Sequence, residues 1–327
     1  MSTKYRIVSL FLALLLMHGI TLAQDTSRVL ATTSIVADVA QNVAGDLLTV
    51  DALVPLGADT HAFEPSPADA ARVAEATMLL MVGAGYEAFL GDLLENVGGG
   101  AEGIVVSNGV EILGFSSEGE AAHLGVLGAE VECDAHDHEE DASEEQHDHG
   151  ACDAHVWTDP AHVIVWANNI AAAFSAAHPA NADAYRANAD AYIAQLEALQ
   201  AEIVQEVATV PEEARVIATN HEFLGYFAHA YGFRVVGTVL PGATTGSEPN
   251  PQELAALIEV IRDEGVRAIF AEVSANPQLA EVVAQEAGIA LVTTLYSESL
   301  SEGDGPAPTY LDYMRYNAET IIAALTN

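Results

Sequence analysis

The sequence predicts an α/β protein with two lobes of alternating strands and helices, each around a mostly parallel sheet, joined by one long rigid helix. Three observations predict this class. Short apolar runs alternate with helical patterns over the first part of the chain, the same alternation resumes after residue 211, and one unbroken helical pattern lies between them. In such folds ligands bind beyond the carboxyl ends of the strands, so we expect the functional site in the cleft between the lobes.

The N-terminal segment is typical of an export signal. Lys4 and Arg6 precede an apolar run over residues 7–16, and Ala23 offers a small residue for cleavage, which predicts a signal peptide over residues 1–23. The run is short for a membrane span, although an uncleaved anchor is the alternative. Because no cysteine lies near this point, we expect a soluble periplasmic or otherwise extracytoplasmic protein without a lipid anchor.

Charge and composition limit the classes of partner. The net charge is −38, which argues against binding to nucleic acid or to anionic membrane surfaces and attracts cations. Half of the residues are hydrophobic, so sizeable cores are available.

The first lobe is expected over residues 24–178. Its β-like runs and helical patterns alternate as parallel βαβ units do. The expected strands cover residues 28–36, 48–54, 78–83 and 103–107, and the expected helices cover residues 36–46, 67–76 and 86–97.

An acidic, histidine-rich loop over residues 115–153 interrupts this alternation. The stretch between Cys133 and Cys152 has almost no apolar residue with which to build a core, so we expect a solvated loop. Imidazole and carboxylate at this density favour divalent transition metals, zinc above all, although simple solvated charge is the alternative. The weak accessory metal sites would use His136, His138, His147 and His149. The two cysteines predict a disulfide in an oxidising compartment, and metal-ligating thiolates are the alternative.

Two helical stretches follow the loop. One begins at Pro160 and runs to about residue 177, and the other covers residues 181–208 within a linking segment of residues 179–210. About 28 residues at 1.5 Å each would reach roughly 40 Å, which fits a rigid spacer between lobes. Its apolar positions recur at helical spacing: Leu196, Leu199, Ile203 and Val207.

The second lobe is expected over residues 211–327 and repeats the plan of the first. The expected strands cover residues 215–220, 233–240, 268–273 and 290–295, and the expected helices cover residues 222–230, 251–264, 277–287 and 310–325.

Four polar side chains occupy loop positions from which they could reach the interlobe cleft. His61 and Glu298 follow predicted strands, His155 lies where order returns after the acidic loop, and His221 follows a strand and opens a helix. No local ligand-spacing motif connects them, and a single histidine is more often structural. Spacing alone therefore does not select these four residues.

Six motifs, in order and over nearly the whole mature chain, resemble the zinc and manganese solute-binding proteins of bacterial ABC transporters (the cluster A-I metal-binding family). The motifs are SIVADVAQNVAGD, GADTHAFEPSPAD, DAHVWTDP, NHEFLGYFAHAYGF, GSEPNPQELAALI and SESLSEGDGPAPTYLDYMRYNAETI. The resemblance implies a protein that is not an enzyme, captures a divalent metal ion and delivers it to a membrane permease. We expect it to act as a monomer.

The resemblance also implies the ligands. His61, His155 and His221 match the three imidazole ligands, and Glu298 stands where many members have an aspartate. A water molecule, an open position or Asp304 is the alternative to Glu298 as the fourth ligand. Three imidazoles and one carboxylate suit tetrahedral zinc.

Zn²⁺ is the expected metal and Mn²⁺ the runner-up. In manganese-preferring relatives a glutamate often replaces the third histidine, and this chain has His221 there, although Glu222 follows directly. CDAH occurs twice, and His155 is favoured over His136 because Val156, Trp157 and Pro160 supply ordered packing around it. The acidic residues that are candidates to orient the ligands are Glu64, Asp159 and Glu272, and the alternative for each is an ordinary helix cap or surface acid.

Other histidines and other functions complete the expectations. Surface or packing roles are expected for His123, His162, His178 and His229. An iron-preferring transport protein, a zinc hydrolase, and a metal buffer or adhesin are the alternative functions. No HExxH-like pattern supports the hydrolase.

Overall fold

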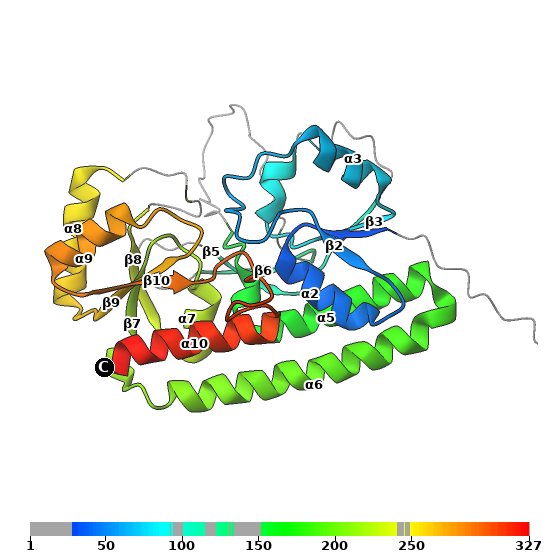
Figure 1. Ribbon diagram of the computed structural model, residues 1–327. Helices are drawn as coiled ribbons and strands as arrows, with labels where there is room; N and C mark the ends of the chain where they lie inside the picture. The colour runs from blue at the N-terminus through cyan, green and yellow to red at the C-terminus, as the bar shows by residue number, and fades with distance from the viewer. Residues whose placement is uncertain are drawn as a thin grey trace, which may run out of the picture.

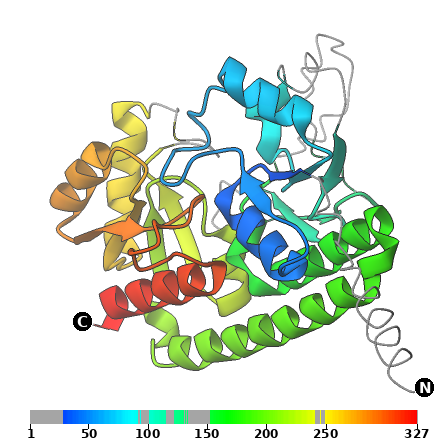
Figure 2. The same ribbon diagram turned by 45° about the vertical axis from the view of Figure 1, so that its right-hand side comes forward.

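The computed structural model describes residues 28–91, 93, 101–114, 122–129, 131, 133, 152–240, 245 and 249–326. Two four-stranded parallel sheets form two lobes, which lie side by side above a long helix (Figures 1 and 2). The predicted fold class is confirmed. Among the described residues, no helix has both the length and the apolar character needed to cross a membrane.

The first sheet has the strand order β2-β1-β3-β4, and every neighbouring pair is parallel. Its strands are β1 (Val29–Ala31), β2 (Val50–Ala52), β3 (Met78–Met81) and β4 (Glu102–Val105). The connections contain α2 (Ser34–Ala44), α3 (Pro67–Glu75) and the 3₁₀ helix η1 (Tyr86–Leu90).

The second sheet has the order β10-β9-β7-β8 and is also parallel throughout. Its strands are β7 (Val216–Thr219), β8 (Arg234–Thr238), β9 (Ala268–Glu272) and β10 (Ala290–Leu295). The helices between them are α7 (Gly225–Tyr231), α8 (Pro251–Asp263) and α9 (Gln278–Ala287).

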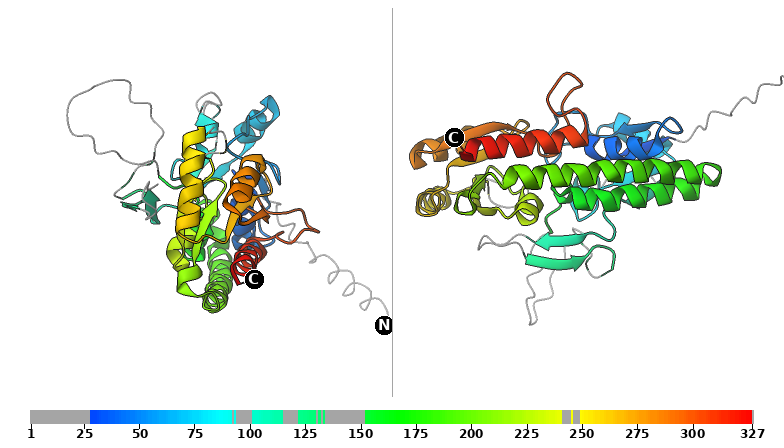
Figure 3. Two further views of the ribbon diagram at one scale, coloured as in Figure 1. Left: turned by 90° about the vertical axis from the view of Figure 1, so that its left-hand side faces the viewer. Right: turned by 90° about the horizontal axis from the view of Figure 1, so that it is seen from below.

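Three helices lie together beneath the lobes (Figure 1 and the right view of Figure 3). They are α5 (Pro160–Ala177), α6 (Ala182–Val207) and α10 (Tyr310–Thr326). The 26 residues of α6 reach about 39 Å at the α-helical rise. Its apolar stripe, with Leu196 and Ile203 fully buried, packs on α5 and α10. Helix α6 therefore runs under both sheets and limits how far they can separate.

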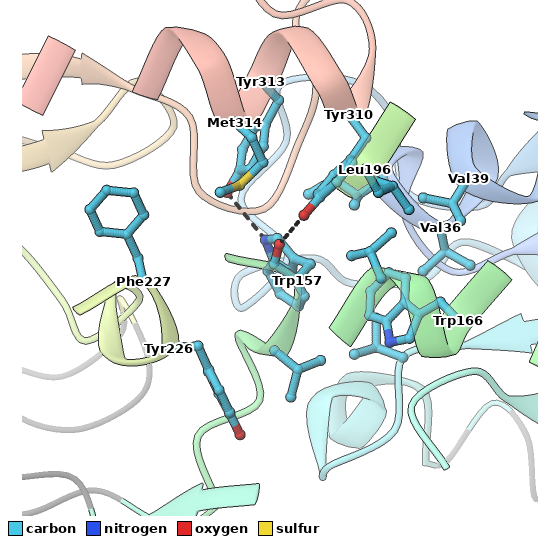
Figure 4. Packing of buried hydrophobic residues seen from close by; sticks show 14 of the residues in the cluster. Val36, Val39, Trp157, Trp166, Leu196, Tyr226, Phe227, Tyr310, Tyr313 and Met314 are labelled. Atoms are coloured by element: carbon cyan, nitrogen blue, oxygen red, sulfur yellow. Dashed lines mark hydrogen bonds between the residues drawn. The ribbon is translucent and has the colours of Figure 1, made fainter. Parts of the chain in front are cut away.

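One buried apolar cluster reaches from the first lobe into the second, and Trp157 lies within it (Figure 4). Trp157 belongs to the 3₁₀ turn η2 (Val156–Thr158). Its indole Nε1–H donates to the carbonyl of Ser297 at 2.9 Å, and the Tyr310 hydroxyl donates to the backbone carbonyl of Trp157 at 2.7 Å. Because this packing joins η2 to the segment before α10, the lobes share a core instead of meeting only through a linker.

Local chemistry shifts several boundaries from those predicted. The first strand ends at Ala31, because the Thr33 side chain accepts a hydrogen bond from the amide of Val36 and starts α2 at Ser34. The helix expected over residues 86–97 begins as the 3₁₀ helix η1. His221 does not open a helix, since α7 starts only at Gly225.

Part of the predicted acidic loop is a strand, so the prediction of a loop over all of residues 115–153 was wrong. β6 (Ala122–Val126) pairs antiparallel with β5 (Glu111–Gly114) to form a hairpin. Leu124 of β6 packs against the main apolar cluster, which offsets the cost of ordering this polar segment. The four histidines of the loop, at positions 136, 138, 147 and 149, lie outside the described residues.

Candidate metal centre

Four side chains from distant parts of the chain converge between the two sheets, and we call them the central cluster: His61, His155, His221 and Glu298. One ligand atom from each lies within 4.8 Å of all the others. Glu298 Oε1 is 2.7 Å from Nε2 of His61, 3.4 Å from Nε2 of His221 and 3.6 Å from Nε2 of His155. The structure thus brings together the four residues that the motifs had suggested.

Strand ends explain how three of them meet. His61 follows β2 of the first sheet, whereas His221 and Glu298 follow β7 and β10 of the second. The carboxyl edges of the two parallel sheets face each other, so the loops that leave these edges meet. His155 comes from the turn before η2, where Cys152 has just paired with Gly114 at the end of the hairpin.

The central cluster is almost completely buried. His155 and His221 expose 1% and 0% of their surface and Glu298 exposes 3%. The His61 side chain is 13% exposed, the largest value of the four. An ion would therefore reach the cluster on the side of His61.

Carboxylates fix the orientation of two of the imidazoles. Asp153 Oδ1 lies 2.9 Å from Nδ1 of His155, and Glu272 Oε1 lies 2.8 Å from Nδ1 of His221. An Nδ1–H that donates to a carboxylate leaves the Nε2 lone pair free for a metal ion and makes the imidazole more basic. Within the described part of the chain, the three Nε2 atoms and Glu298 Oε1 form no hydrogen bond of good geometry.

The charges in the cluster are strongly coupled. Burial opposes protonation of His221, but the hydrogen bond to Glu272 and the nearby charge of Glu298 outweigh burial and raise its pKa to about 10. Burial likewise opposes protonation of His155, and Asp153 and Glu298 raise its pKa nonetheless. Burial would raise the pKa of Glu298, but the three imidazoles hold it well below its usual range. Glu298 therefore stays a carboxylate.

Three imidazole nitrogens and one carboxylate oxygen at this separation suit a divalent transition-metal ion. Buried polar atoms without a hydrogen bond are costly, and a cation bound at their centre would satisfy all four at once. The residues present therefore fit a metal ion.

The loop that carries Glu298 is held against the first lobe. The amide of Thr60 donates to Glu298 Oε2 at 3.2 Å, and the amide of Gly57 donates to the Ser299 hydroxyl at 2.8 Å. The amide of Leu300 donates to the hydroxyl of Ser34 at 3.0 Å. Although Glu298 follows a strand of the second sheet, its position is set by hydrogen bonds to the first lobe.

The three acidic residues expected to orient ligands have different positions. Glu272 contacts His221 as described. Asp159 instead caps α5, with its Oδ1 accepting from the amide of Ala161 at 2.9 Å, and Glu64 is exposed. Neither Asp159 nor Glu64 has a hydrogen bond or ion pair to a residue of the central cluster among the contacts of the described residues.

Asp153 is the functional residue that sequence reasoning missed. It lies two positions before His155, and its Oδ1 also accepts from the His155 amide at 2.9 Å. Asp153 belongs to the second CDAH motif. Its position two residues before His155 was the available signal in the sequence. Of the alternatives, Asp304 is exposed, and the cluster takes in His221 and not Glu222.

A disulfide joins Cys133 and Cys152, with their Cα atoms 6.0 Å apart. Its two cysteines bracket residues 134–151 in the sequence, and Cys152 stands directly before Asp153. The covalent link thus ties the first lobe to the residue that orients His155.

Proteins named for metal binding match most of this chain in sequence. The manganese ABC transporter substrate-binding lipoprotein PsaA of Streptococcus mitis is 27% identical over 304 residues, which cover 91% of this chain and 89% of that protein. The manganese-binding lipoprotein MntA of Bacillus subtilis is 29% identical over 308 residues, which cover 93% and 91%.

Solved structures share the architecture. The Mn-bound periplasmic metal binding protein from Candidatus Liberibacter asiaticus superposes with a TM-score of 0.75 at 27% identity, over 91% of this chain and 99% of that one. The periplasmic zinc binding protein TroA from Treponema pallidum has the same fold, with a TM-score of 0.74 at 24% identity and the same coverage.

The family described as zinc-uptake complex component A, periplasmic (ZnuA) matches residues 29–324, which is nearly all of the described chain. This chain therefore belongs to the ZnuA family of periplasmic metal-binding proteins, the substrate-binding components of metal ABC transporters.

Proposed function

We propose that this protein captures zinc outside the cytoplasm and delivers it to the membrane permease of its ABC transporter, with the central cluster as the cargo site. One observation carries the proposal. Four ligand atoms, three of them imidazole nitrogens, converge within 4.8 Å of one another in a buried position. Asp153 and Glu272 hold two of these imidazoles with Nε2 directed at the centre.

The donor set favours zinc over manganese. Three nitrogens and one oxygen complete the tetrahedral shell that Zn²⁺ adopts, whereas Mn²⁺ prefers carboxylate, carbonyl and water oxygens. The burial of Glu298 leaves little room for additional water ligands. Manganese is the second candidate, because the relatives PsaA and MntA are named as manganese-binding proteins.

Binding and release are coupled to protons. The raised pKa of His221, about 10, means that an incoming ion displaces a proton near neutral pH. Acid therefore favours release. His61 would dissociate from the ion first, because it is the most exposed ligand. The lobes would separate only modestly during release, because α6 and the shared core hold them together.

Separate affinities for zinc and manganese test the choice of metal. An experiment in which zinc and manganese compete in one solution would not identify the physiological metal, because zinc binds more tightly than manganese to almost any such site. We expect X-ray absorption of the zinc-loaded protein to show four nearest neighbours dominated by imidazole. We expect His221→Glu to lower zinc affinity far more than manganese affinity, whereas Glu64→Gln, an exposed carboxylate, leaves both unchanged.

Gene deletion tests the role in the cell. A strain that lacks the protein should fail to grow when zinc is limiting and recover when zinc is added. Recovery on manganese alone, or a six-coordinate zinc shell dominated by oxygen, would overturn the zinc proposal.

A further inference from the structure

A second pair of histidines lies outside the central cluster, where the β5–β6 hairpin meets α7. His123 is on β6 and His229 is in the last turn of α7. Their ring centroids are 4.9 Å apart, with an angle of 74° between the planes. The three imidazoles of the central cluster have centroid separations of 5.3, 5.6 and 5.8 Å and angles of 61° to 81°. The two outer rings thus lie about as close together, and at a similar angle, as the rings of the central cluster.

A carboxylate orients one member of the outer pair. Glu111 Oε1, on β5, lies 2.8 Å from Nδ1 of His123. The same pairing, at 2.8 and 2.9 Å, directs the Nε2 atoms of His221 and His155 into the central cluster. With Nδ1–H donating to Glu111, the Nε2 of His123 carries the free lone pair.

The junction that carries the outer pair is held in place by buried contacts. The Tyr226 hydroxyl, on α7, accepts from the amide of Leu113 at 3.0 Å and donates to the carbonyl of Asp153 at 2.8 Å. The His162 ring packs edge-on against Tyr226, with centroids 5.0 Å apart. The hairpin and α7 are therefore fixed relative to each other before any ion arrives, which lowers the cost of binding.

The outer pair is open to solvent, unlike the central cluster. The side chains of His123 and Glu111 are 48% and 59% exposed, and His229 is exposed. The hairpin stands out from the body of the molecule in both views of Figure 3. An ion from solution can reach this position directly and keep water ligands there, so the site should bind more weakly than the buried cluster.

We propose that Glu111, His123 and His229 form a second binding site for a divalent transition-metal ion, with the two imidazoles as ligands and Glu111 as the group that positions His123. Zinc is the expected ion, since nitrogen donors favour it. The site joins the hairpin of the first lobe to α7 of the second. It is independent of which metal fills the central cluster.

Anomalous scattering at the zinc edge tests the proposal on crystals of the full chain equilibrated with zinc chloride. We expect a peak between the rings of His123 and His229, separate from the peak at the central cluster. His229→Ala should abolish the outer peak and leave the central one. His178→Ala is the matched control, because it removes a histidine at the far end of α5 and should leave both peaks.

Zinc counting in solution removes dependence on the crystal. Equilibrium dialysis should show one fewer zinc ion per chain for His123→Ala and for His229→Ala, and no change for His178→Ala. The proposal is overturned if no outer peak appears, if the peak survives His229→Ala, if a neighbouring molecule in the crystal supplies its ligands, or if the solution count is unchanged. If the wild-type crystals show the outer peak but no peak at the central cluster, the proposed cargo site is refuted instead.

Discussion

Glu272→Gln isolates the contribution of a residue that touches a ligand but would not touch the metal ion. The Glu272 side chain is fully buried, and its Oε1 accepts from Nδ1 of His221 at 2.8 Å and from Nδ2 of Asn220 at 3.1 Å. Glutamine keeps the shape and can keep an oxygen at that position. It removes the charge and places an amide donor where Oε2 has no hydrogen-bond partner among the described residues.

The expected loss is large enough to measure. Removing an outer carboxylate from a ligand imidazole typically lowers metal affinity about 10- to 100-fold, or roughly 1.4 to 2.7 kcal/mol. Full burial of Glu272 places this variant toward the upper end. The pKa of His221 should also fall, because one of the two carboxylates that raise it to about 10 loses its charge. Protons then compete less with zinc, which offsets part of the loss.

Titration calorimetry with zinc from mildly acidic to mildly alkaline pH separates the two effects. The variant should bind zinc more weakly than the wild type, and its affinity should change less with pH. Glu64→Gln makes the same chemical change at an exposed site and should match the wild type in both respects. Unchanged affinity together with unchanged pH dependence in Glu272→Gln would refute the reasoning, provided that the metal-free variant melts like the wild type.

Three further results are expected. His61→Ala should abolish tight zinc binding in calorimetry, whereas replacing residues 134–151 with a short Gly/Ser linker should spare it; the reverse outcome would move the tight site into the acidic segment. In the metal-free protein, the pKa of His221 is raised, so its contribution to stability is complete below its unfolded pKa of ~6.5 and is lost as pH rises toward about 10. The pKa of Glu298 is lowered, so its contribution is present above its ordinary pKa of 4.5 and is lost in stronger acid. Thermal melts without metal should therefore show maximum stability between the ordinary pKa of Glu298 and the unfolded pKa of His221. A Tm that keeps rising toward alkaline pH would contradict the pairing of His221 with its carboxylates. Tyr226→Phe removes a buried hydroxyl that bridges the hairpin and the turn before η2. The variant should have a free energy of unfolding about 1 to 3 kcal/mol lower in urea denaturation, and an unchanged free energy would show that the bridge is not formed in solution.

Local patterns in the sequence determined most of the architecture. Alternating apolar runs and caps specify elements through contacts only a few residues apart, so the parallel sheets and the long helix were predictable. Where two local signals competed, the stronger contact decided the outcome. Thr33 caps α2 within a segment that the sequence predicted to be a strand. β6 forms in a polar segment because it pairs with β5 and packs against the core.

The central cluster was predictable only through the resemblance of motifs, because no spacing connects His61, His155, His221 and Glu298. Their convergence depends on how two separate sheets dock over α6, which no local pattern encodes. The same reason explains the orienting acids: Asp153 lies two residues before His155 and Asp159 four residues after it, yet only Asp153 is turned toward its Nδ1. Sequence alone determined which chemical groups are available, and packing determined which of them meet, because direction in space is set by the whole fold.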